Sequence, residues 1–144
     1  MPKKPFVVAK TLLINDRNQA LVLRRSVWPE KPERSHQADI PGGMVDVGEL
    51  EINGAAREIK EETGIVINPQ DLILGYTKTF YDDLHDQSHT KFFYVSRIDH
   101  TPEVIISYEH ESYDWTPVPQ LLEKYEFTEF YEESIRYLIG HGLI

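Results

Sequence analysis

Residues 41–65 read PGGMVDVGELEINGAAREIKEETGI and join a glycine-containing turn to the clearest helical pattern in the chain. Gly42 and Gly43 allow the backbone to bend and to approach a ligand closely. Residues 50–63 have the apolar spacing of an amphipathic helix, and Gly64 is well placed to end it. The segment therefore predicts a loop, a helix and a second loop in succession.

Three glutamates fall within one turn of this predicted helix. Residues three or four positions apart are neighbours on a helix, so Glu58, Glu61 and Glu62 gather their carboxylates in one region. Their repulsion costs an isolated helix roughly 0.2–0.5 kcal/mol per pair, and Arg57, four residues before Glu61, relieves only part of it. Clustered oxygen ligands suit Mg²⁺ or Mn²⁺. A solvated acidic helix face is the alternative that these glutamates alone leave open.

From Gly43 to Ile65 the sequence fits G-x5-E-x7-R-E-U-x-E-E-x-G-U, where U is a bulky aliphatic residue, without a mismatch. This pattern resembles the signature of the Nudix (MutT-like) hydrolase family. The resemblance implies an α/β/α sandwich with a mixed β-sheet, formed as a single domain over residues 1–144, in which residues 43–65 are the catalytic loop–helix–loop. It also implies a Mg²⁺- or Mn²⁺-dependent attack of water on the diphosphate bridge of a nucleoside diphosphate derivative.

The resemblance assigns metal-binding roles within this stretch. Glu58 and Glu62 match the principal metal ligands of the family, and Glu61 supports them. Gly43 would add a backbone carbonyl to the ligand set. These four residues are the expected metal site.

The resemblance also indicates orienting and proton-accepting residues. Glu49 and Arg57 look like an orienting pair, but they are eight positions apart, so contact requires Glu49 to lie off the regular helix. The residue that takes the proton of the attacking water differs within the family. Here the candidates are Glu58 itself and two acids of a later loop, Glu109 and Glu111.

Substrate contacts are expected outside residues 43–65. Arg24 and Arg25 end a predicted strand and are candidates for phosphate binding, and the loop that follows them runs to Asp39. Ala38 stands where many nucleotide-directed members carry an aromatic residue. Tyr81 stands where ADP-ribose-cleaving members carry a proline, and a tyrosine near this position is typical of dinucleoside-polyphosphate hydrolases. Arg24, Arg25, Asp39 and Tyr81 are therefore the expected substrate-binding residues.

A small (d)NTP or similar nucleotide pyrophosphohydrolase is the favoured function. The alternatives are an ADP-ribose, nucleotide-sugar or dinucleoside-polyphosphate hydrolase, and a module that senses a nucleotide without cleaving it. The intact glutamates favour hydrolysis over sensing.

The rest of the chain is rich in strand patterns. Alternating or β-branched runs predict several strands, and a second amphipathic helix begins at an N-cap threonine and ends near Gly140. Two polar stretches predict long loops. The predicted strands are 6–14, 20–24, 72–81, 91–98 and 103–107, the helix is 128–139, and the loops are 28–37 and 82–90.

Composition limits the classes of binding partner that the chain is expected to have. The 144 residues contain 15 Lys and Arg against 24 Asp and Glu, so the net charge is 15 − 24 = −9, and a general nucleic-acid binder would be basic instead. The chain has no cysteine, which excludes thiol nucleophiles and Cys-ligated zinc. The apolar run near the N-terminus is too short for a signal peptide or a membrane span. These features predict a cytoplasmic protein with a small-molecule partner and leave a homodimer open.

Overall fold

Seven strands form one mixed sheet in the computed structural model, which describes residues 3–144. The order along the sheet is β3-β2-β1-β6-β5, with β4 paired to β1 and β7 paired to β2. β1 runs parallel to β6 and antiparallel to β2 and β4, which confirms the mixed sheet. The strands are β1 (Phe6–Ile14), β2 (Gln19–Arg25), β3 (Ala38–Asp39), β4 (Gly42–Met44), β5 (Ile73–Asp82), β6 (Gln87–Arg97) and β7 (His110–Pro117).

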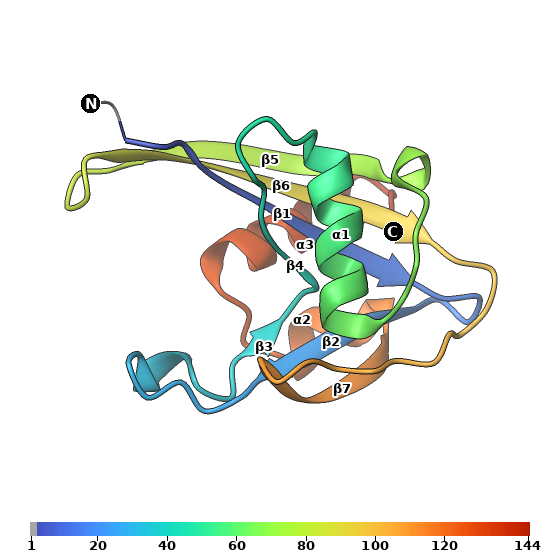
Figure 1. The fold of residues 1–144 in the computed structure, drawn as a ribbon. Coiled ribbons are helices and arrows are strands. Elements are labelled where there is room, and N and C mark those ends of the chain that lie inside the picture. The colour runs from blue at the N-terminus through green and yellow to red at the C-terminus, as the bar shows by residue number, and fades with distance from the viewer. Residues whose placement is uncertain (1–2) are drawn as a thin grey trace.

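Helices cover both faces of this sheet, as the sandwich architecture requires (Figure 1). α1 lies across one face, and the C-terminal helices lie against the other. The helices are α1 (Glu51–Thr63), α2 (Leu121–Lys124) and α3 (Glu129–Gly140), with 3-10 turns η1 (Pro32–Arg34), η2 (Pro69–Asp71) and η3 (Val118–Gln120). Gly64 ends α1 in the left-handed region at φ 74°, as predicted.

The alternation of side chains along β1 divides the core into two layers. Leu13 packs with Ile59 on the α1 side, whereas Leu12 packs with Phe93 and Ile135 on the α3 side. Successive side chains of a strand point to opposite faces, so one apolar strand supplies both cores. Burying each large aliphatic side chain contributes about 1.5–3 kcal/mol.

The hairpin between β5 and β6 is tighter than the predicted loop over residues 82–90. Strand pairing continues outward through Phe80 with His89 and Asp82 with Gln87, which leaves only residues 83–86 as the turn. Asp86 takes a positive φ of 49°, a conformation that aspartate tolerates in turns. Because the residues of this hairpin are polar, the sequence pattern did not indicate that β5 extends to Asp82 and that β6 begins at Gln87.

The segment before β7 also differs from the prediction. Residues 103–107 are not a strand; instead Ile105 donates its N–H to the Thr63 carbonyl at 2.9 Å, and Ser107 donates to the Glu62 carbonyl at 3.3 Å. These bonds satisfy carbonyl groups that the end of α1 leaves unpaired. Of the acidic residues that follow, Glu109 precedes β7, whereas Glu111 and Asp114 belong to β7, which pairs with β2 along its length.

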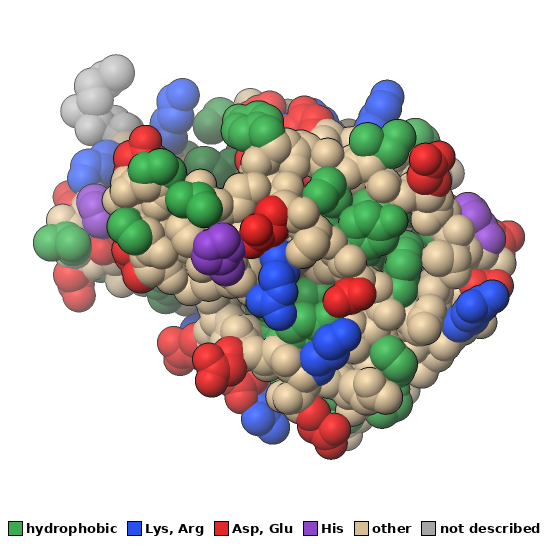
Figure 2. All heavy atoms as spheres, turned by 90° about the horizontal axis from the view of Figure 1, so that it is seen from below, with side chains coloured by type: hydrophobic (Ala, Val, Ile, Leu, Met, Phe, Trp, Pro, Cys, Tyr) green, Lys and Arg blue, Asp and Glu red, His purple; other side chains and the backbone are tan. Residues whose placement is uncertain are grey.

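Surface features agree with the composition. No helix within residues 3–144 is long and apolar enough to cross a membrane. On the face that Figure 2 shows, acidic and basic side chains are interspersed around apolar ones, and no basic stripe runs across it.

Candidate active site

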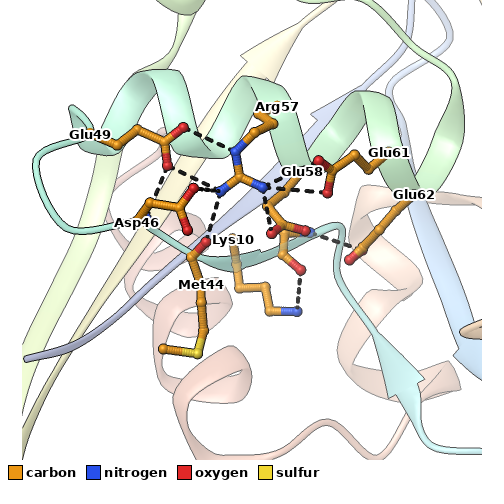
Figure 3. A network of polar contacts seen from close by, with 9 residues as sticks. Lys10, Met44, Asp46, Glu49, Arg57, Glu58, Glu61 and Glu62 are labelled. Carbon is orange, nitrogen blue, oxygen red and sulfur yellow. Dashed lines mark hydrogen bonds and ion pairs between the residues drawn. The ribbon is translucent and has the colours of Figure 1, made fainter. Parts of the chain in front are cut away.

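Arg57 is the centre of a polar network that connects α1 to the loop before it (Figure 3). Glu49 precedes the first residue of α1, so it lies off the regular helix. Its two carboxylate oxygens accept hydrogen bonds from Nε and Nη2 of Arg57, both at 3.0 Å. Nη2 also donates to the Met44 carbonyl at 3.0 Å. This two-pronged pairing fixes the guanidinium and, with it, the end of β4.

Two of the three clustered glutamates share the other side of this guanidinium. Nη1 of Arg57 donates to Glu58 at 3.1 Å and to Glu61 at 3.4 Å. Glu61 is the more exposed of the two, with 57% of its side chain accessible against 17% for Glu58. Arg57 therefore offsets the repulsion between neighbouring acids and holds Glu58 in place.

Glu58 and Glu62 face the two glycines of β4. A Cβ atom built on Gly43 would lie 2.7 Å from the carboxyl carbon of Glu58, so only glycine leaves room for that carboxylate. The Gly42 N–H donates to Glu62 at 3.3 Å, and Nζ of Lys10 donates to the Gly42 carbonyl at 3.0 Å. β4 pairs with β1 at this point, which fixes the backbone against which both carboxylates lie.

Burial perturbs these two carboxylates. Desolvation raises the pKa of Glu62 to about 8, although Lys10 opposes the shift. Desolvation also raises the pKa of Glu58, against the effect of Arg57. Each group lacks the full compensating positive charge that its buried, ionised form requires.

A hard divalent cation fits this donor set. Glu58 and Glu62 are hard oxygen donors packed against two glycines, and a cation would supply the missing charge. In residues 3–144 no group of three Asp, Glu or His side chains is positioned as a ready-made metal site. Glu61 is directed to Nη1 of Arg57, at 3.4 Å.

A cavity of about 800 Å³ opens beside Gly42, Gly43 and Glu62. Its size is typical of a small-molecule site. Basic, acidic and aromatic side chains contribute to its wall. They include Lys10, Arg25, Arg34, Lys91, Glu33, Asp39, Glu109, Phe6, Trp28, Phe80, His89, Phe130 and Tyr131.

Asp39 is the most heavily bonded carboxylate of this wall. It is buried and accepts hydrogen bonds from Nε2 of His110 and the hydroxyl of Tyr131, each at 2.8 Å, and from Nζ of Lys10 at 3.3 Å. Arg25 lies 3.5 Å from it. Burial alone would raise the pKa of Asp39, but Lys10 and the other partners outweigh it and hold that pKa well below its usual range. Asp39 thus joins five elements, β1, β2, β3, β7 and α3.

The structure brings some predicted substrate residues to the cavity and not others. Arg25 and Asp39 line it, whereas Arg24 and Tyr81 do not. Arg24 donates to the His36 carbonyl at 3.0 Å and lies over the Tyr125 ring. The period of two along β5 explains Tyr81, because its neighbour Phe80 takes the cavity face. Between Arg24 and Arg25 the register of β2 with β7 shifts, so simple alternation does not hold there.

Of the predicted proton acceptors in the later loop, only one reaches the cavity. Glu109 lines it, whereas Glu111, on β7, pairs with His36 on the surface. Phe80 takes the place in the wall that the sequence suggested for Tyr81.

The residues that sequence reasoning missed include Lys10, Lys91 and Tyr131 of this wall, and His110, which bonds to Asp39. Lys10 carried a readable signal, since it interrupts the apolar run FVVAKTLLI and a buried lysine needs a partner. His110 and Tyr131 carried none, because only the tertiary fold brings them to Asp39.

Comparison with known proteins gives matches over nearly the whole chain. The family model of the NUDIX domain matches residues 4–138. The mouse protein named bis(5'-nucleosyl)-tetraphosphatase [asymmetrical] is 28% identical over 95 residues, which are 65% of this chain and 65% of that protein, so this chain spans about two thirds of its relative's length.

Solved structures share the fold. The MutT protein from Methanosarcina mazei Go1 superposes with a TM-score of 0.80 at 25% identity, covering 99% of each chain. A C. elegans Ap4A hydrolase in a binary complex gives a TM-score of 0.70 at 20% identity, covering 94% of this chain and 96% of that one, a likeness of fold.

Proposed function

The chain belongs to the NUDIX domain family, and on that premise we propose that it is a divalent-metal-dependent hydrolase of a small nucleoside diphosphate derivative. The reaction is cleavage of the diphosphate linkage by water. The observation that carries the proposal is the placement of Glu58 and Glu62 against Gly43 and Gly42, at the edge of the cavity. A sequence selected only for folding has no reason to bury two under-compensated carboxylates there.

Glu58 and Glu62 would hold Mg²⁺ or Mn²⁺, with the Gly43 carbonyl and Glu61 as further oxygen donors. When bound, such an ion neutralises the phosphates and lowers the pKa of a water molecule. Arg57 keeps Glu58 in position through the hydrogen bond between them, and Glu49 fixes Arg57 in turn. This arrangement fixes the position of the Glu58 carboxylate, and precise positioning is the main contribution of a protein to phosphoryl chemistry.

Glu109 is the favoured acceptor of the proton from water. Its side chain lines the cavity, and within residues 3–144 its carboxylate forms no ion pair. Glu58 accepts a hydrogen bond from Arg57, and Glu111 pairs with His36, so both are less suited to the role. Glu109 also adjoins His110, which the buried Asp39 holds, so its backbone is anchored.

A (d)NTP or similar small nucleotide is the favoured substrate. Dinucleoside polyphosphates are the second candidate, because the mouse relative is named a bis(5'-nucleosyl)-tetraphosphatase. ADP-ribose and nucleotide sugars are weaker candidates. Cytoplasmic residence and a homodimer remain predictions.

The test is a panel of NTPs, dNTPs, ADP-ribose, nucleotide sugars and diadenosine polyphosphates, assayed with Mg²⁺, Mn²⁺ and EDTA. We expect metal-dependent phosphate or pyrophosphate release that falls at least roughly 100-fold in Glu58→Gln and in Glu62→Gln. Glu109→Gln should lower kcat, whereas the matched change Glu111→Gln should not. Full activity in both box variants would refute the metal assignment, and nucleotide binding without turnover across the panel would favour the sensing module.

A further inference from the structure

Lys91 is a half-buried cation in the wall of the cavity. It lies on β6, and its Nζ sits over the rings of Phe80 and Phe130, at 5.5 Å and 5.6 Å from their centroids. Within residues 3–144 its side chain forms neither an ion pair nor a hydrogen bond to a carboxylate. Partial burial removes some of the water that would otherwise solvate the charge.

The charged groups that act most strongly on Lys91 are basic, although Glu129 of α3 lines a smaller pocket beside it. Lys78 on β5 is its direct cross-strand partner, an arrangement that destabilises a sheet. Desolvation lowers the pKa of Lys91, and Lys10, Arg34 and Lys78 lower it further. Lys10 is compensated by Asp39 and Lys78 by Glu133, but neither acid reaches Lys91.

Arg34 is a second basic residue of this wall, and its side chain is exposed to solvent. It ends η1, its guanidinium lies 5.6 Å from the centroid of Trp28, and within the described residues it forms no ion pair. Glu33 and Glu109 also line the cavity, but neither pairs with Arg34 or Lys91. In a chain of net charge −9, two basic groups left free in one cavity indicate an anionic ligand.

The same cavity has an acidic edge at Glu62 and Gly43 and a basic, aromatic wall at Lys91 and Arg34. We propose that Lys91 and Arg34 form a second anion subsite, which binds a phosphate beyond the diphosphate bridge that would lie against the cation held by Glu58 and Glu62. The inference rests on the proposed function and narrows its substrate class. Substrates then carry a chain of at least three phosphates, which favours nucleoside triphosphates and dinucleoside polyphosphates over ADP-ribose and nucleotide sugars.

Binding of inorganic tripolyphosphate tests the subsite without catalysis. Isothermal titration calorimetry would compare tripolyphosphate with pyrophosphate on wild type, Lys91→Met, Lys91→Arg and the control Lys124→Met, which removes an exposed lysine on α2 outside the cavity. We expect Lys91→Met to weaken tripolyphosphate roughly 10- to 100-fold and pyrophosphate much less. Lys91→Arg should retain most of the affinity, and Lys124→Met should match wild type.

Stability separates a ligand-binding role from a structural one. Because Lys91 faces other cations, Lys91→Met should unfold at the same temperature as wild type or higher. A lowered melting temperature, an unchanged tripolyphosphate affinity, or an equal loss for pyrophosphate would each overturn the subsite.

Kinetics then distinguish this inference from the function on which it rests. In Lys91→Met, kcat/KM for triphosphates and dinucleoside polyphosphates should fall by the same factor as binding, while any activity on ADP-ribose stays within about twofold. If all substrates fall alike, the subsite is wrong and the hydrolase stands. If no substrate is cleaved while tripolyphosphate binding still depends on Lys91, the hydrolase is wrong and the subsite stands.

Discussion

Replacing Gly43 with alanine should abolish most activity while leaving the fold intact. The added Cβ would lie 2.7 Å from the carboxyl carbon of Glu58, whereas carbon atoms in contact are normally about 3.5–4.0 Å apart. The Glu58 carboxylate must therefore move by about 1 Å. A misplacement of that size costs on the order of 100-fold in rate.

The cost of Gly43→Ala in stability is small. An off-rotamer glutamate costs about 0.5–1.5 kcal/mol. The φ of Gly43 is one that alanine can adopt, and reducing the freedom of the unfolded chain returns about 0.4–1 kcal/mol. The two effects nearly cancel, so the free energy of unfolding should stay within about 1 kcal/mol of wild type.

The adjacent glycine provides the matched control. Gly42 has a φ of 143°, and a Cβ there would lie 2.1 Å from the backbone oxygen of Ala9 on β1. Backbone atoms of a paired strand cannot yield as a side chain does, so Gly42→Ala should lose about 2–5 kcal/mol of stability.

Urea denaturation and Mg²⁺-dependent turnover, measured on wild type and both variants, check this prediction. The expected result is an inactive but stable Gly43→Ala beside a destabilised Gly42→Ala. Gly43→Ala with wild-type activity would refute the claim that the position of Glu58 against β4 matters for the reaction.

Two further changes test the networks around the site. The pKa of Asp39 is held below its unfolded value near 3.9, so its stabilisation is present above that pH and is lost on acidification. Asp39→Asn leaves Lys10 buried and uncompensated and should lower the free energy of unfolding by about 3–5 kcal/mol at pH 7. In urea denaturation, this difference from wild type should narrow below pH 4. A difference that does not change with pH would contradict the prediction. Arg57→Lys breaks the two-pronged bond to Glu49 and should lower turnover roughly tenfold with a loss of about 1 kcal/mol, whereas Arg136→Lys on the surface of α3 should change neither.

The part of the site that the sequence predicted is the part that is local in sequence. The helix of residues 51–63, its Gly64 cap and the neighbourhood of Glu58 and Glu62 follow from a period of 3.6 residues, and these were confirmed. The contact of Glu49 with Arg57 could be predicted only on the condition that Glu49 lies off the regular helix, because eight helical positions would hold the two residues too far apart.

The pairing between strands was harder to predict from the sequence. β7 carries charged residues on its exposed positions, so Glu111 was assigned to a loop although it lies on a strand that pairs with β2. Residues 103–107 are apolar enough for a strand but use their N–H groups on the end of α1. Local composition cannot distinguish these outcomes, because the partner is supplied by another part of the chain.

The parallel pairing of β1 with β6 explains why the cleavage chemistry can be predicted from the sequence more easily than the choice of substrate. This pairing sets Val8 opposite Lys91 and Lys10 opposite Phe93. Side chains two residues apart share a face, so Lys10 and Lys91 lie on the same face, toward Phe130 and Tyr131 of α3. Glu62 reaches the edge of that cavity from the opposite face, across the two glycines of β4. One helical segment can therefore encode the cleavage chemistry. The charge that selects the length of the phosphate chain lies on Lys91, some eighty residues from Lys10 in sequence, and only the folded sheet brings the two together.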